Sequence, residues 1–160
     1  MDDEVAVYNS QLSSLLRNVA RTVEGLSEAE LNWRPPVPEP NSAFALASHI
    51  VGNLEAWILG IVCGEDVGRD REAEFAAAGA DASSLIATAE ALSERFEVAL
   101  GALPSGHLDA LVTPDPVLWG SDAPPEISVR RVLGSTIVHI SGHVGHLEIT
   151  RDLAVAANAG

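Results

Sequence analysis

The sequence contains no lysine, and this absence dominates its charge. All nine cationic side chains are arginine, against 23 aspartate and glutamate residues, so the formal net charge is −14 and the isoelectric point is about 4.5. Proteins bind nucleic acids and anionic membrane surfaces through basic patches. The charge therefore argues against nucleic acid and membrane as partners.

Cysteine is almost absent as well. Cys63 is the only one, which excludes a disulfide framework and fits a reducing cytoplasm. We expect it to be a small buried hydrophobe. The stretch MDDEVAVYNS is acidic and polar, so we expect no secretory signal. The longest apolar run, WILGIVCG, is far shorter than the roughly 20 residues that span a bilayer. These features predict a cytoplasmic protein.

Proline is missing from most of the chain. All nine prolines lie at 35–40 and 104–125, and an acidic, glycine-punctuated stretch at 63–81 indicates a third break. Because proline is costly inside a helix, the remaining segments can be helical. Apolar periodicity and capping residues predict helices over residues 4–24, 42–63, 81–103 and 128–157.

Four amphipathic helices of about 20 residues, each about 30 Å long, predict an all-α four-helix bundle. The length of 160 residues favours one domain, residues 1–160. Of the three links between the predicted helices, the first two are of medium length and the third is long. They are compatible with an up-down type of bundle with long connections, but they do not determine the order of the helices.

The last predicted helix contains a group of histidines. His139, His143 and His146 lie within VHISGHVGHLEITRD, along one edge of the apolar stripe. Two imidazoles one turn apart can bind one metal ion, so the pair could be His139 with His143 or His143 with His146. Alternatively, all three are ordinary, partly buried side chains. Gly142 and Gly145 between them predict either close approach of another backbone or room for a ligand.

A fourth histidine lies in the second predicted helix. His49 is at the edge of its apolar stripe, with Asn53 one turn further on. A lone histidine there is more often a hydrogen-bonded core residue than a ligand. However, one ligand from this helix and two from the last could converge inside a bundle on zinc, nickel, iron or copper. Three protein ligands would leave positions open for water or substrate. The fifth histidine, His107, is expected to be solvent-exposed.

Two stretches of the chain resemble the DinB-like (DinB/YfiT) family. LNWRPPVPEPNSAFALASHIVGNLEAWILG is similar to the connection between the first two helices of that family. The H-x-x-x-H-x-G-H pattern and HVGHLEITRDL resemble the final helix of its actinobacterial members. The likeness covers nearly the whole chain.

The resemblance implies a four-helix bundle with a metal held by three side chains. These map to His49, His139 and His143, and we expect the metal to be zinc or nickel. His146 would then line the pocket. Together with Asn53 it is our candidate for binding a cosubstrate, and Arg34 is a further polar anchor. A homodimer is also considered.

Family members with known activity resemble thiol S-transferases and a thiol-dependent isomerase that use mycothiol, bacillithiol or glutathione. The resemblance thus implies a metal-dependent enzyme that transfers a low-molecular-weight thiol to an electrophile, or a thiol-dependent isomerase or hydrolase. Because the composition and the His-x-Gly-His variant look actinobacterial, mycothiol is the first candidate. The alternatives are a non-catalytic metal-binding stress-response or sensor protein, and a bundle that has lost its metal. The presence of all three histidines argues against the last of these.

Overall fold

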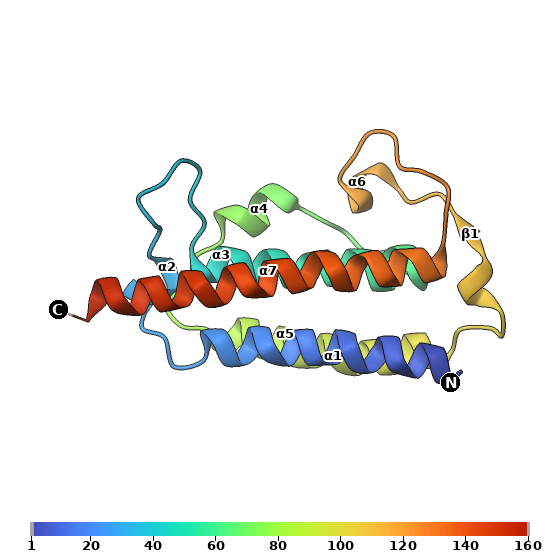
Figure 1. The fold of residues 1–160 in the computed structure, drawn as a ribbon, viewed down its shortest axis with the longest axis horizontal. Coiled ribbons are helices and arrows are strands. Elements are labelled where there is room, and N and C mark those ends of the chain that lie inside the picture. The colour runs from blue at the N-terminus through green and yellow to red at the C-terminus, as the bar shows by residue number, and fades with distance from the viewer. Residues whose placement is uncertain (1, 160) are drawn as a thin grey trace.

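The computed structural model describes residues 2–159, and long helices make up most of it (Figure 1). The first and last long helices each begin at a side-chain cap: Asp2 accepts from the backbone N–H of Glu4, and Ser128 from that of Arg131. The long helices are α1 (Asp3–Val23), α3 (Ala43–Leu54), which continues as the π-helical η1 (Glu55–Val62), α5 (Ser83–Gly101) and α7 (Val129–Asn158).

The long helices form two layers, with α3 and α7 in one and α1 and α5 in the other (Figure 1). Helix α7 packs antiparallel to α3, which brings the start of α3 towards the C-terminal half of α7. It runs parallel to α1, since Arg130 near the start of α7 pairs with Glu4 near the start of α1 at 2.8 Å. The all-α four-helix bundle is therefore confirmed.

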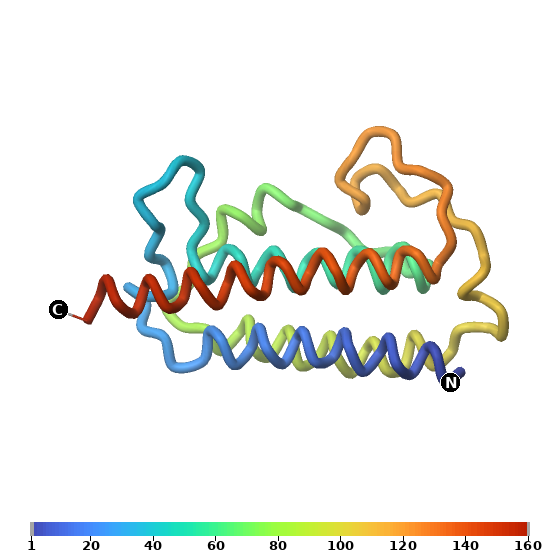
Figure 2. Tube along the Cα trace, viewed as in Figure 1, coloured from blue at the N-terminus to red at the C-terminus, as the bar shows by residue number. Residues whose placement is uncertain are grey.

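The four long helices do not simply alternate in direction along the chain. Helices α3 and α5 run in the same direction, because residues 63–82 return along the bundle between them (Figure 2). The return includes the short helix α4 (Arg71–Ala76). A stretch of about 20 residues can span well over 30 Å when extended, so a link of this length permits either direction for the next helix.

The segment before α5 differs slightly from the sequence prediction. The third helix was predicted to begin at residue 81, but it begins at Ser83 and the cap position is Ala82. Asp81 still accepts a hydrogen bond from the backbone N–H of Ser83 at 2.8 Å. The second helix begins as predicted after Ser42, whose hydroxyl accepts from Ala45 at 3.2 Å.

Several short elements in the links were not predicted. One of them, α2 (Glu28–Asn32), could have been predicted from the sequence, because Ser27 and Glu30 form a capping box at its start. The others are the 3-10 turn η2 (His107–Asp109), helix α6 (Pro116–Trp119) and strands β1 (Leu111–Val112) and β2 (Ile127–Ser128), which pair antiparallel.

The α3–η1 helix is the most buried part of the core. Residues Ala43–Val62 are long and apolar enough to cross a membrane, but 78 % of their most apolar window is buried inside the bundle. Such burial is typical of the core helix of a soluble protein. Helices α4 and α6 both lie on the outer side of the α3–α7 layer, away from α1 and α5 (Figure 1). The predicted site residues lie on the α3–α7 layer.

Candidate functional site

Three histidines predicted from the sequence meet between α3 and α7. His49, His139 and His143 each offer a ligand atom, and these atoms all lie within 4.8 Å of one another. The ring of His143 lies edge-on to both others, with centroids 4.9 Å from His49 and 4.6 Å from His139. Of the two pairs that the helical spacing left open, the structure therefore places His139 and His143 beside His49.

Burial increases from the outer to the inner member of this cluster. His139 is exposed, His143 is half-buried and His49 is 2 % exposed. Because α3 and α7 run antiparallel, residues of α3 and η1 meet α7 in reverse order: His49 faces His143, and Trp57 lies parallel to His139 at 5.8 Å. The cluster thus opens to solvent on the His139 side.

The ring of His49 is held from the far side by α4. Its Nδ1 atom lies 2.8 Å from Oε2 of Glu74, and its ring stacks on Phe75 at 4.2 Å. Glu74 in turn accepts from Nε of Arg69 at 3.1 Å. Burial alone would raise the pKa of Glu74, but hydrogen bonds from His49 and Arg69 outweigh it and lower the pKa.

The pKa values of His139 and His143 on α7 are both lowered, which favours their neutral forms. Burial lowers the pKa of His143 to about 4, and the nearby charges of His49, His139, His146 and Arg71 act in the same direction. Burial is also the largest cause of the lowered pKa of His139, followed by neighbouring positive charge. Neutral imidazoles have a lone pair to offer, which is the state that binds metal.

A cavity of about 510 Å³ reaches the cluster at His139. Trp57 and Trp119 form one wall, stacked at 4.5 Å with their planes 8° apart. Trp57 donates its indole N–H to the carbonyl of Leu118 at 2.9 Å, which attaches α6 to η1. Polar groups elsewhere in the wall belong to Glu126, Ser128, Arg131 and Ser135.

A second, wider hollow of about 1020 Å³ lies between α4 and α6. Its wall includes Phe75, the residue that stacks on His49, and the apolar residues Pro116 and Val117. Arg34 and Arg71 also line it. Separate hollows therefore lie near the histidine cluster: this one beside Phe75, the ring that covers His49, and others that His139 itself lines.

A family model described as Mycothiol-S-transferase matches residues 8–155. The chain belongs to this family. The match confirms the predicted DinB-like resemblance, since the mycothiol-S-transferase family is DinB/YfiT-like. It supports a thiol S-transferase-like function on a small-molecule substrate. No curated protein matches the chain.

The donor set of this mycothiol-S-transferase family member suits a divalent transition metal. Three imidazoles are typical ligands for zinc and its neighbours, and three protein ligands leave room for a small-molecule ligand. A metal-binding histidine commonly donates its other ring nitrogen to a carboxylate, and His49 has Glu74 in that place. The residues present therefore fit a metal ion.

The predicted cosubstrate-binding residues lie in different settings. Asn53 is 3 % exposed, one turn from His49 and one turn from Trp57, and its Oδ1 atom has no hydrogen-bond partner among residues 2–159. His146 is exposed on α7 and lies outside the three-histidine cluster. Arg34 donates to the carbonyls of Pro40 at 2.7 Å and Phe75 at 3.3 Å.

Several residues around the cluster had no sequence signal. Glu74 and Arg69 lie in the acidic link at 63–81, and only the path of that link brings them to His49. Trp119 lies in the proline-rich segment at 104–125, which was expected to be a link, and Trp57 lies within the second predicted helix without a feature that would mark it as a site residue. Their roles depend on contacts between segments far apart in the chain.

The glycines of α7 do not mark a helix contact. A Cβ added at Gly142 or Gly145 would meet no atom of the described chain within 4 Å, so the prediction of close backbone approach is wrong. The close approach is instead at Gly52 on α3, where a Cβ would overlap the carboxylate of Glu74. Gly52 therefore lets α4 bring Glu74 against α3.

Cys63 and His107 complete the reactive side chains considered from the sequence. Cys63 is partly buried, and burial followed by the charge of Glu65 raises its pKa to about 12, so its thiol is protonated at neutral pH. His107 was expected to be solvent-exposed, but it is partly buried and its Nε2 atom lies 3.0 Å from the carbonyl oxygen of Val62. The turn η2 folds back onto the end of η1 and produces this contact.

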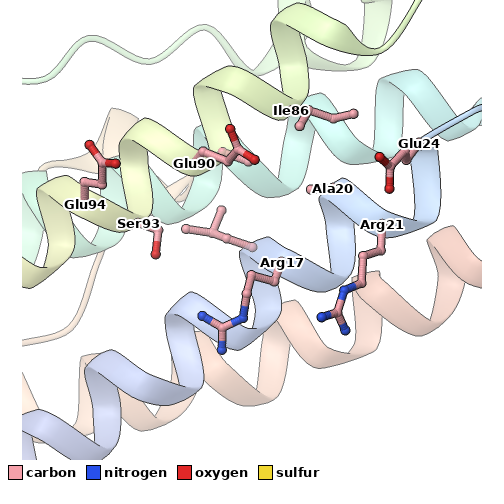
Figure 3. A pocket seen from close by; sticks show the side chains of 10 residues that line it. Arg17, Ala20, Arg21, Glu24, Ile86, Glu90, Ser93 and Glu94 are labelled. Carbon is pink, nitrogen blue, oxygen red and sulfur yellow. The ribbon is translucent and has the colours of Figure 1, made fainter.

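A further hollow of about 440 Å³ lies between α1 and α5 (Figure 3). Arg17 and Arg21 on α1 border it opposite Glu90 and Glu94 on α5. It contains no histidine or cysteine and belongs to the layer away from the histidine cluster. The residues that line this hollow offer no histidine cluster that could bind a metal ion. We therefore place the candidate site between α3 and α7.

Proposed function

We propose that the chain is a metal-dependent thiol S-transferase in which His49, His139 and His143 hold one divalent transition metal, zinc or nickel. The convergence of these three side chains, with ligand atoms within 4.8 Å of one another, is the observation that supports this most directly. The family assignment supports the thiol chemistry. A divalent ion bound there would act as a Lewis acid and lower the pKa of a thiol beside it.

In the proposed reaction a thiol sulfur forms a bond to an electrophilic carbon, and the bond from that carbon to its leaving group breaks, with the electron pair staying on the leaving group. The S–H bond also breaks, and its proton passes to solvent or to the leaving group. Cys63 is not suited to replace the external thiol as the nucleophile, because its pKa of about 12 keeps it protonated at neutral pH. The protein's task is then to orient the two substrates and to limit the access of water.

We assign one hollow to each substrate. The cavity beside His139 combines two indole faces with Glu126, Ser128, Arg131 and Ser135, a lining that suits a polyhydroxylated thiol such as mycothiol. The hollow beside Phe75, with Pro116 and Val117, suits an apolar electrophile. His139 itself lines the first hollow, and Phe75 in the wall of the second stacks on His49, so both hollows lie beside the same histidine cluster.

Asn53 and His146 are proposed to bind the thiol cosubstrate. The Oδ1 atom of Asn53 is a buried acceptor without a partner among the described residues, and a hydroxyl or amide group of the thiol could donate to it. His146 is proposed to contact the outer part of the same molecule. The predicted homodimer and cytoplasmic location stay predictions.

Elemental analysis of protein purified without chelator or affinity tag tests the metal. We expect about one zinc or nickel ion per chain. The next measurement is steady-state conjugation of several low-molecular-weight thiols to a panel of electrophiles, with His143→Ala as the control. Metal-free protein that also rejects added metal would overturn the metal site. Turnover that persists in a metal-free His143→Ala variant would overturn the metal-dependent mechanism, and absence of turnover with every thiol would favour a non-catalytic metal-binding protein.

A further inference from the structure

A buried ion pair lies behind His49, on the side away from α7. The side chain of Arg69 is 3 % exposed and that of Glu74 is 10 % exposed. Arg69 donates to both carboxylate oxygens, from Nε to Oε1 at 3.1 Å and from Nη2 to Oε2 at 3.4 Å. A pair this buried is costly to form, and it is tolerated only when its remaining hydrogen-bonding groups are satisfied.

Those remaining groups connect three elements. Oε2 of Glu74 lies 2.8 Å from Nδ1 of His49 on α3, and Nη1 of Arg69 donates to the carbonyl of Leu118 on α6 at 2.9 Å. Trp57 on η1 donates to the same carbonyl at 2.9 Å. Gly52 provides the space that the Glu74 carboxylate occupies against α3. The carboxylate is thus fixed in place from several sides.

This arrangement determines which nitrogen of His49 has the proton. A carboxylate paired with an arginine only accepts hydrogen bonds. Nδ1 of His49 must therefore be the donor, and in the neutral ring Nε2 has the free lone pair. The ring stacks on Phe75 and is nearly perpendicular to the ring of His143, with centroids 4.9 Å apart, so its rotation is restricted as well.

We propose that Glu74, held by Arg69, is a positioning residue that keeps His49 in the Nδ1–H tautomer and presents Nε2 to the centre shared with His139 and His143. The statement about the tautomer concerns the protein alone. Its consequence for metal affinity rests on the proposed function. The competing explanation is that Glu74 only attaches α4 to the bundle, in which case its loss would change stability without changing the tautomer or the affinity of folded protein.

The tautomer is measured first, in metal-free protein, by long-range ¹H–¹⁵N correlation spectra of the imidazole nitrogens, with His49→Gln to assign the signals. We expect protonated Nδ1 and unprotonated Nε2 for His49 in the wild type. In Glu74→Ala we expect a shift towards the Nε2–H form that free histidine favours. Glu74→Gln should retain the wild-type tautomer in part, since its amide oxygen can still accept. Glu72→Gln, the same change on the exposed side of α4, is the matched control and should leave the spectrum unchanged.

Metal affinity is measured next, by zinc competition with a chromophoric chelator and by the visible spectrum of the cobalt-substituted protein. We expect Glu74→Gln to weaken zinc binding 10- to 100-fold, as for other partners of metal-binding histidines, and to alter the cobalt spectrum. Circular dichroism and thermal unfolding of the metal-free variants identify any variant that fails to fold. Of these variants, we expect Glu74→Gln to disturb folding least, because its side chain has nearly the size of the original.

The outcomes separate the two proposals. A wild-type protein that rejects metal overturns the proposed function, while the tautomer of His49 still tests the role of Glu74. A wild-type tautomer in folded Glu74→Ala overturns the positioning role. Wild-type zinc affinity in folded Glu74→Gln and Glu74→Ala overturns its consequence for the metal centre.

Discussion

Trp57 and Trp119 stack face to face, with ring centroids 4.5 Å apart and planes inclined by only 8°. They belong to segments 62 positions apart, and the stack closes one side of the cavity beside His139. Trp57 is 8 % exposed, whereas Trp119 is only half-buried, so Trp119 presents the more accessible ring. The pair joins the core helix to the connection that covers it.

Replacing Trp119 with Ala should impair the substrate step without removing the metal site. Loss of one stacked aromatic partner costs about 1 kcal/mol, and a similar loss in substrate binding would reduce kcat/KM for the thiol by roughly five- to tenfold. Steady-state kinetics together with metal content measure this. Unchanged kcat/KM in a metal-replete variant would show that the thiol does not use this wall.

The histidines of α7 should differ in their importance for metal binding. Replacing His139 or His143 with Ala should abolish tight binding, because each supplies a ligand atom to the cluster. His146→Ala should weaken binding less, by about 10- to 100-fold, as expected for a group that acts through its neighbours. Isothermal titration with zinc compares the three. If His146→Ala abolished zinc binding while His139→Ala retained it, the metal-binding pair on α7 would be His143 and His146 instead.

Cys63 should react slowly with alkylating agents in the folded protein. Its pKa of about 12 leaves almost no thiolate at pH 8, and the rate should keep rising with pH well above 8.5, where a free thiol is half ionised. Iodoacetamide labelling followed by mass spectrometry measures the rate, with urea-unfolded protein as the fast control. The Cys63→Ala variant should retain transferase activity. If this variant were inactive, Cys63 itself would be implicated as the nucleophile.

Asn53→Leu should separate ligand binding from stability. The unpartnered Oδ1 atom of Asn53 is buried, and an unsatisfied buried acceptor costs about 1–3 kcal/mol. An apolar side chain of similar size should therefore leave the thermal midpoint unchanged or raise it, while KM for the thiol rises. Thermal unfolding and kinetics on the same preparation test both expectations. A lower thermal midpoint with an unchanged KM would show that Asn53 stabilises the core and does not bind the thiol.

Two glycine substitutions should have opposite effects. Alanine is favoured over glycine in a helix by up to about 1 kcal/mol, so Gly142→Ala, with open space around its Cβ, should stabilise the protein slightly and leave metal affinity unchanged. Gly52→Ala would bring its Cβ into the carboxylate of Glu74, so it should destabilise the protein and weaken zinc binding. Chemical denaturation and zinc competition compare the two variants. Equal effects would mean that Glu74 moves aside at no cost.

Much of the helical framework could be predicted from the sequence, because its signals are local. The segments without proline and the apolar periodicity within them placed the long helices within a few residues of their observed ends. The spacing on one helix edge also identified two candidate metal-binding pairs, His139 with His143 and His143 with His146, and the structure has the first of them beside His49. Helical periodicity depends only on neighbouring residues, so it is readable from one chain.

The partners of those elements were decided only by the tertiary structure. The cost of closing a loop rises slowly with its length, so the links did not determine whether α5 runs with α3 or against it. The return of residues 63–82 along the bundle is what brings Glu74 and Arg69 behind His49. Likewise, the antiparallel packing of α3 on α7 unites His49 with His139 and His143, and the contact of α6 with η1 joins Trp119 to Trp57. These contacts join residues far apart in the chain, where no periodic pattern records which segments will meet.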